Sequence, residues 1–132
     1  MGLKPLVNGR IPIYGRGMET ARLFVDRYYE LLAAADVERL AMLYADEAEI
    51  VRYDGVAKTD EEIRAYFREY LDQRPGLKLR QIDQLRRAED VLLWDAMLDS
   101  DGGVLQTVEV MILDEDGRIR RHIPGFRGYW GL

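Results

Sequence analysis

The first third of the chain carries apolar residues at helical spacing. Over residues 19–35 they recur every three or four positions, which predicts a helix with one apolar face. These residues are Ala21, Phe24, Val25, Tyr28 and Leu32. Asp36 is a suitable N-cap for a short second helix, whose apolar residues follow the same spacing up to Tyr44. The pattern therefore predicts two consecutive helices that cover one core.

A strand and a third helix are expected next. Residues 49–53 have the pattern of a short strand. Thr59 and Glu62 have the spacing of a capping box, in which each side chain accepts a hydrogen bond from a backbone N–H at the start of a helix. Pro75 and Gly76 would end this helix.

The second half of the chain changes to strand alternation. Four strands are predicted, at about residues 78–86, 91–99, 104–113 and 118–126. The segments DSDGG and DEDG between the last three supply glycine for tight turns. We therefore expect an α+β fold: a cone-shaped, curved antiparallel sheet with three helices packed on its concave face, as in a cystatin-like α+β barrel.

The domain organisation is simple. A chain of 132 residues is long enough for one domain with a sizeable core. We expect that domain over residues 18–132, after an extended arm at residues 1–17. The arm contains two prolines and four glycines, but also apolar residues that would pack on the sheet or on a partner subunit.

Composition excludes several classes of function. The net charge of −5, with both signs interspersed, disfavours a nucleic-acid partner. There is no cysteine, and the single histidine with scattered carboxylates matches no metal-ligand spacing, so we expect no metal. No glycine-rich phosphate loop follows a strand, and no cofactor is expected. Neither a signal peptide nor a membrane-spanning segment is recognisable, which favours a cytoplasmic location without a membrane partner.

The order of these elements resembles the nuclear transport factor 2-like superfamily, and within it the SnoaL-type polyketide cyclase and ketosteroid isomerase-like branch. The resemblance is carried by residues 27–31, 43–48 (LYADEA), 108–111 (VEVM) and 116–119 (DGRI). It covers residues 20–126 and implies a small-molecule pocket and a homodimer formed through the sheet. The reaction is left open, because this fold carries isomerases, cyclases, dehydratases, epoxide hydrolases and binding modules.

The resemblance also implies roles for individual positions. In the isomerase branch, a tyrosine on the first helix and an acid on a late strand hydrogen-bond a developing enolate oxygen, and an aspartate on the first strand moves the proton. These positions hold Tyr28, Glu109 and Arg52 here. An arginine keeps its proton near neutral pH and cannot act as the base. Asp54 could replace it, although Asp54 also has the position of the first residue in an Asp-Gly turn.

Each of these residues has a second interpretation. Glu109 interrupts the apolar strand at residues 108–112, which predicts either a pocket carboxylate or a solvent-facing side shared with Thr107. Tyr28 would be a pocket residue or a core aromatic. Arg52 would point inward or into water. If Arg52 and Glu109 both point inward, they should form an ion pair that orients a carboxylate or phenolate ligand.

His122 is the only histidine, and histidine suits proton transfer near neutral pH. It is our first choice for the general acid or base, with Asp54 second, although a lone histidine is also common as a structural or surface residue. The pocket wall is expected to contain apolar and aromatic side chains. These are Tyr44, Tyr66, Phe67, Trp94, Met111 and Phe126.

These expectations combine into two functional hypotheses. The first is a cofactor-independent enzyme of the isomerase, cyclase or dehydratase type, which moves a proton on a small apolar molecule with a carbonyl or carboxylate group. The second is a non-catalytic module of the same fold that binds a small ligand or forms dimers. A cavity of several hundred cubic ångströms would favour the first hypothesis or a ligand-binding protein, and a filled cone would favour a structural module.

Overall fold

The computed structural model describes residues 18–131, so the predicted arm at residues 1–17 lies outside the described residues. All three expected helices are present. α1 spans Met18–Ala33, α2 spans Val37–Met42 and α3 spans Asp60–Asp72.

The helix starts follow from local hydrogen bonds. At α2, the Asp36 carboxylate accepts a 3.1 Å hydrogen bond from the Arg39 backbone N–H. At α3, the Glu62 N–H donates to the Thr59 hydroxyl and the Thr59 N–H donates to the Glu62 carboxylate, both at 3.1 Å. The predicted caps therefore satisfy backbone donors that a helix leaves free in its first turn.

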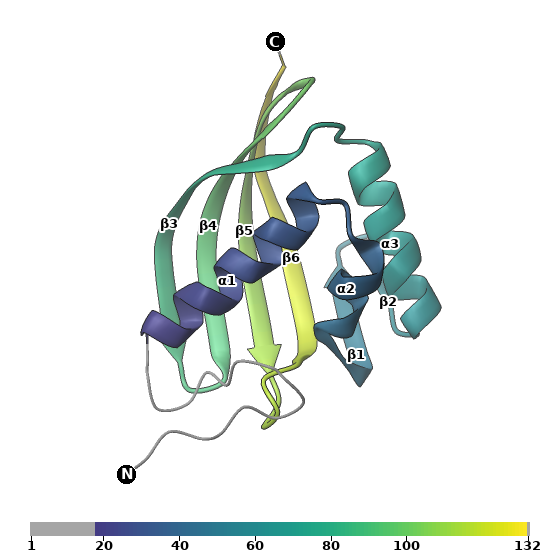
Figure 1. Cartoon of the computed structure of the whole chain (residues 1–132), viewed down its shortest axis with the longest axis vertical. Helices are drawn as coiled ribbons and strands as arrows, with labels where there is room; N and C mark the ends of the chain where they lie inside the picture. Colours follow the sequence, from purple (N-terminus) through teal and green to yellow (C-terminus); the bar gives the residue numbers. More distant parts are fainter. Residues whose placement is uncertain (1–17, 132) are drawn as a thin grey trace.

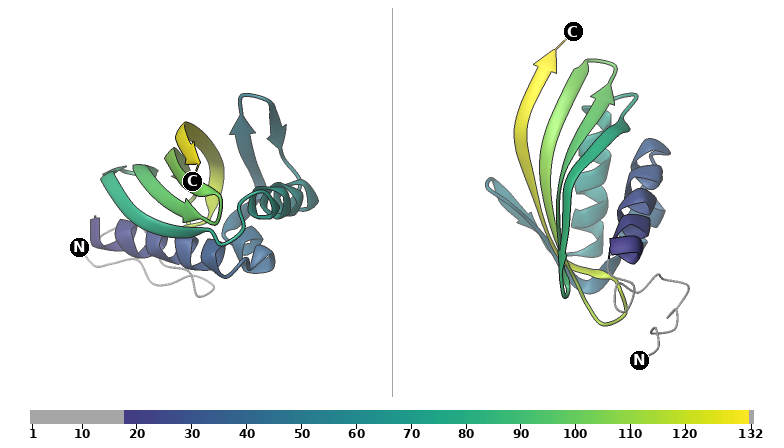
Figure 2. Two further views of the ribbon diagram at one scale, coloured as in Figure 1. Left: turned by 90° about the horizontal axis from the view of Figure 1, so that it is seen from above. Right: turned by 90° about the vertical axis from the view of Figure 1, so that its left-hand side faces the viewer.

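Within residues 18–131, six strands form one curved sheet in the order β2-β1-β6-β5-β4-β3. The strands are β1 Tyr44–Arg52, β2 Gly55–Ala57, β3 Lys78–Ala88, β4 Val91–Ser100, β5 Gly103–Leu113 and β6 Ile119–Gly131. Strands β3 to β6 curve around α1, and α2 and α3 lie beside β1 and β2 (Figures 1 and 2). The α+β class and the curved sheet with its helices are thus confirmed.

The sheet differs from the prediction in its details. β1 pairs with β6 in parallel, so the sheet is mixed rather than antiparallel throughout, and it stays open between β2 and β3. The short strand β2 was not predicted. β1 begins at Tyr44 instead of residue 49, because the Ile119 N–H bonds to the Leu43 carbonyl at 2.8 Å and draws this segment onto β6.

The core lies between the concave face of the sheet and the apolar side of α1 and α3. Trp94 on β4 and Phe67 on α3 are its largest fully buried side chains. The Trp94 indole N–H donates to the Tyr29 hydroxyl at 2.8 Å, so this polar pair is satisfied inside the core. Strand alternation points every second residue of β5 toward the core, and this set includes Glu109.

Candidate functional site

A cavity of about 940 Å³ opens where β1 and β6 separate. The two strands pair as far as Ile50 and His122, and their next residues, 51–54 and 123–126, line the cavity. Figure 2 shows the β1–β2 hairpin turning away from the rest of the sheet. Pro124 lies just beyond the last pair and has no N–H to donate to a neighbouring strand, so the end of pairing has a local cause.

The other walls come from α3 and β5. The end of α3 contributes a row of polar and aromatic side chains on one helix face. The lining residues from α3 and the residues after it are Tyr66, Glu69, Tyr70, Gln73 and Arg74. Strand β5 contributes Leu105, Thr107 and Glu109, which lie on the core side of the sheet and form the floor.

Glu109 on this floor belongs to a chain of three buried polar side chains. His122 Nε2 lies 2.7 Å from Glu109 Oε1, and His122 Nδ1 lies 2.8 Å from the Tyr44 hydroxyl. Glu109 is 5% exposed and His122 is 0% exposed. The contact follows from the register: Glu109 pairs with Pro124, and His122 is two residues earlier on the same face of β6.

The donor and acceptor roles in this hydrogen-bonded triad of Glu109, His122 and Tyr44 follow from the chemistry of the three side chains. When Glu109 is ionised, its carboxylate only accepts hydrogen bonds, and the proton between the two groups then belongs to Nε2 of His122. Burial raises the pKa of Tyr44 well above that of a free tyrosine, and the charge of Glu109 contributes. The Tyr44 hydroxyl therefore stays protonated and is a donor for Nδ1. Within the described residues, Glu109 Oε2 makes no hydrogen bond and is available to a ligand.

Arg52 lies at the end of β1, next to Tyr66 of α3, and does not pair with Glu109. Its guanidinium sits over the Tyr66 ring at 5.0 Å, and its Nε is 3.7 Å from Asp54 Oδ1. That Nε is buried and makes no hydrogen bond among the described residues. The ion pair expected between Arg52 and Glu109 is therefore not formed, because Glu109 takes His122 as its partner. Asp54 lies in the turn between β1 and β2.

The residues expected to form the site fall into two groups. Those that line the cavity are Arg52, Asp54, Tyr66, Glu109 and Phe126. Those that lie in the core and do not line it are Tyr28, Tyr44, Phe67, Trp94, Met111 and His122. Tyr28 contacts the His122 ring edge-to-face, with centroids 6.0 Å apart, so it supports that ring from the α1 side.

Sequence reasoning missed Tyr70, Arg74 and Thr107 as lining residues. Tyr70 follows Tyr66 by four positions on α3, and this spacing was a signal that both share one helix face. Arg74 stacks on Tyr70 at 4.1 Å and donates to its backbone carbonyl. Burial raises the pKa of Tyr29 well above the ordinary value, and the nearby Thr107 hydroxyl opposes this shift only slightly. The Thr107 hydroxyl makes no hydrogen bond of normal geometry within residues 18–131.

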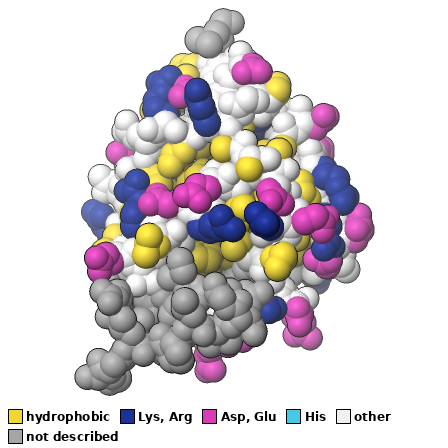
Figure 3. All heavy atoms as spheres, in the orientation of Figure 1, with side chains coloured by type: hydrophobic (Ala, Val, Ile, Leu, Met, Phe, Trp, Pro, Cys, Tyr) yellow, Lys and Arg dark blue, Asp and Glu magenta, His cyan; other side chains and the backbone are white. Residues whose placement is uncertain are grey.

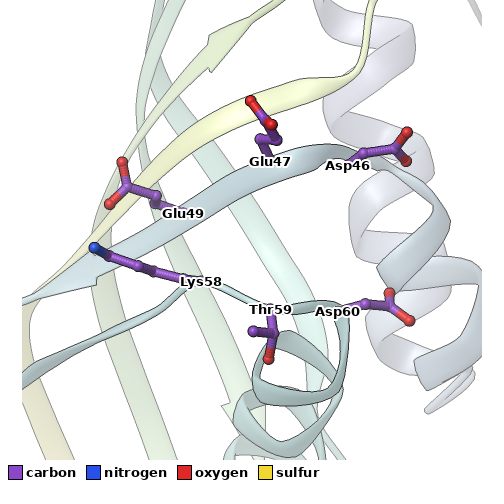
Figure 4. Close-up of a pocket in the computed structure, with 6 residues that line it drawn as sticks. All are labelled: Asp46, Glu47, Glu49, Lys58, Thr59 and Asp60. Carbon is purple, nitrogen blue, oxygen red and sulfur yellow. The ribbon is translucent and has the colours of Figure 1, made fainter.

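A second, more open depression of about 510 Å³ lies between β1 and the start of α3 (Figure 4). Three of its carboxylates are paired individually with arginines: Asp46 with Arg118, Glu49 with Arg121, and Asp60 with Arg64. Among the described residues, no group of three or more histidine or carboxylate side chains is arranged to hold a metal ion. This depression is therefore not the candidate site.

The surface adds little to the picture of the site. On the face that carries the helices, acidic and basic side chains are interspersed with apolar ones, and no histidine is visible (Figure 3). None of the helices in residues 18–131 combines the length and apolar character needed to cross a membrane.

Comparison with known proteins identifies the family. The family model of the SnoaL-like domain matches residues 25–122 of this chain. The chain therefore belongs to the SnoaL-like domain family, which is part of the nuclear transport factor 2-like superfamily. No curated protein matches the sequence.

Solved structures share the fold at low sequence identity. A SnoaL-like protein of unknown function from Burkholderia thailandensis is 20% identical, with a TM-score of 0.71 over 82% of this chain and 95% of its own. A protein from Sphaerobacter thermophilus is 18% identical, with a TM-score of 0.67 over 90% of this chain and 99% of its own. A candidate ketosteroid isomerase from Kribbella flavida is 16% identical, with a TM-score of 0.68 over 86% and 82%.

We predict that the neutral His122 ring carries its proton on Nε2. The reason is that the Glu109 carboxylate can only accept, whereas the protonated Tyr44 hydroxyl can donate to Nδ1. Nitrogen-15 NMR of the ring measures this without assignment, because the chain has one histidine.

Glu109→Gln is the matched variant for that measurement. An amide can donate as well as accept, so the preference for Nε2–H should fall by roughly tenfold. A wild-type ring protonated on Nδ1 would contradict the assignment.

Proposed function

We propose that this protein is an enzyme that moves a proton on a small, mostly apolar molecule bearing a carbonyl or carboxylate group, using its own side chains and no cofactor. The position of Glu109 carries the proposal. This carboxylate lies on the floor of a cavity of about 940 Å³. On the core side, His122 Nε2 lies 2.7 Å from Glu109 Oε1 and holds the carboxylate in place. Buried ionisable groups of this kind concentrate at functional sites.

In this proposal Glu109 is the group that exchanges the proton with the ligand. Its Oε2 removes a proton from the carbon next to the carbonyl, and the electron pair moves to the oxygen as an enolate. Returning the proton to another carbon gives an isomerisation. Attack by the enolate on a second carbonyl gives an aldol-type cyclisation, in which the new alkoxide takes the proton back from Glu109. Loss of a neighbouring hydroxyl, which Glu109 protonates so that it leaves as water, gives a dehydration.

His122 acts through Glu109 because it does not line the cavity and has no exposed surface. Its Nε2–H fixes the orientation of the carboxylate, and Tyr44 occupies Nδ1. Arg52, with its unbonded Nε, supplies positive charge beside a developing oxyanion. We therefore assign to Glu109 the role of direct acid or base that was expected for His122 from the sequence.

The alternative function is a module of the same fold that binds a ligand without turning it over. The cavity supports this alternative as well as the enzyme, and it weighs against a purely structural module with a filled interior. Turnover by Glu109 is the property that separates the two.

The proposal predicts proton exchange that depends on Glu109. When the protein is incubated in D₂O with aryl ketones or cyclic enones that it binds, deuterium should replace the hydrogens on the carbon next to the carbonyl. Mass spectrometry measures this gain in mass. Glu109→Gln should slow this exchange by about 10²- to 10⁴-fold, because it removes the base while keeping the shape.

Asp95→Asn is the matched control, since Asp95 lies on the other face of the sheet and pairs with Arg127 at 2.9 Å. It should exchange at the wild-type rate. Exchange in Glu109→Gln equal to that of Asp95→Asn, or bound ketones that never exchange, would leave only the binding module.

We further propose that the protein acts in the cytoplasm as a homodimer formed through the outer face of the sheet. Leu93, Val110 and Ile123 lie side by side on neighbouring strands of that face, and Leu93 and Ile123 are each 40% exposed. A contiguous apolar row of this kind on an exposed sheet face is typical of a protein–protein interface.

The dimer is tested by charging the centre of that row. Val110→Glu should raise the dissociation constant by at least about 30-fold, because it buries a charge in an apolar contact, and analytical ultracentrifugation measures it. Val56→Glu on β2 introduces the same charge at an exposed position outside the row and should leave the dimer intact. A wild-type protein that sediments as one chain at high concentration would refute the dimer.

A further inference from the structure

Two phenol groups on the α3 wall of the cavity have no hydrogen-bond partner within residues 18–131. Tyr66 and Tyr70 both line the cavity, and their ring centroids are 5.9 Å apart. Neither hydroxyl makes a hydrogen bond to another described residue. Both hydroxyl oxygens keep some accessible surface, so they are donors that a ligand in the cavity can use.

Both phenols remain protonated and can donate. Burial raises the pKa of Tyr66 and of Tyr70 well above the ordinary value, and the charge of Glu109 raises both further. The positive charges of Arg52 and Arg74 oppose this shift only in part. The wall therefore presents two neutral O–H donors in the same cavity as the Glu109 carboxylate.

The charge of the lining favours an uncharged ligand. Arg52 and Arg74 are positive, whereas Asp54, Glu69 and Glu109 are negative, which gives a net charge of −1. An anion entering this cavity meets net repulsion, because a low-dielectric wall strengthens charge interactions. A neutral carbonyl oxygen accepts from the same donors without that cost.

The walls also favour a flat ligand. Arg52 covers the face of Tyr66 at 5.0 Å and Arg74 covers the face of Tyr70 at 4.1 Å, so this side of the cavity is built from stacked planar groups. Phe126 on β6 also lines the cavity and is 62% exposed, which leaves its aromatic ring free to contact a ligand.

We propose that Tyr66 and Tyr70 are ligand-binding residues whose hydroxyls donate to the carbonyl oxygen of an uncharged, planar ligand. The inference rests on the proposed function, because it requires a ligand in the cavity beside Glu109. It narrows the ligand class from carbonyl or carboxylate compounds to neutral conjugated ketones and enones, and it assigns the oxygen to the α3 wall.

Three probes of one shape test this assignment: 2-acetylnaphthalene, its alkene isostere 2-isopropenylnaphthalene, and 2-naphthoate. Calorimetric titration should give an affinity for the ketone about tenfold higher than for the alkene or the carboxylate. Tyr66→Phe and Tyr70→Phe should each lower the affinity for the ketone by about three- to tenfold and leave that for the alkene unchanged, because each removes one hydrogen bond and keeps the ring.

Tyr29→Phe is the control, since it removes a buried hydroxyl that bonds Trp94 and does not line the cavity. It should change none of the three affinities. Equal affinity for ketone and alkene, tighter binding of 2-naphthoate, or a ketone preference that survives both phenylalanine variants would overturn the assignment while leaving the cavity as a binding site. Failure of all three probes to bind the wild-type protein would count against the proposed function itself.

Discussion

The hydrogen bond between His122 and Glu109 is the contact on which the site depends. A carboxylate in the core needs a hydrogen-bonding partner, and removing one partner of a buried pair typically costs about 3–5 kcal/mol. Here the partner is itself buried and is completed by Tyr44, so three polar groups satisfy one another inside an apolar core. One face of Glu109 is thereby fixed, and its other oxygen is left for the cavity.

The cavity exists because two neighbouring strands stop pairing. β1 and β6 run together as far as Ile50 and His122, then separate where Pro124 cannot donate a hydrogen bond. Arg52, the last residue of β1, pairs with Gly55 of β2 and not with β6, and its guanidinium lies over Tyr66 on α3. Because the SnoaL-like fold carries many reactions, this local opening and its charged residues say more about function than the family does.

The sequence predicted the elements well and the contacts between them less well. The caps at Asp36 and Thr59 are local signals, so the helix starts could be read directly. The apolar run at residues 108–112 left two directions open for Glu109, and the structure selects the inward one. The partner of Glu109 depends on the register between β5 and β6, which no local pattern specifies. Tyr44 continued a helical pattern, but pairing with Ile119 placed it in a strand, where its hydroxyl reaches His122.

The most direct test of the account is whether His122 senses the cavity that it does not line. In the wild-type protein saturated with 2-acetylnaphthalene, the Nε2 resonance of this single histidine should shift, because a ligand against Glu109 Oε2 changes the hydrogen bond at Oε1. A resonance that stays unchanged with the ligand bound would mean that the buried dyad is structural and that the cavity does no chemistry through it.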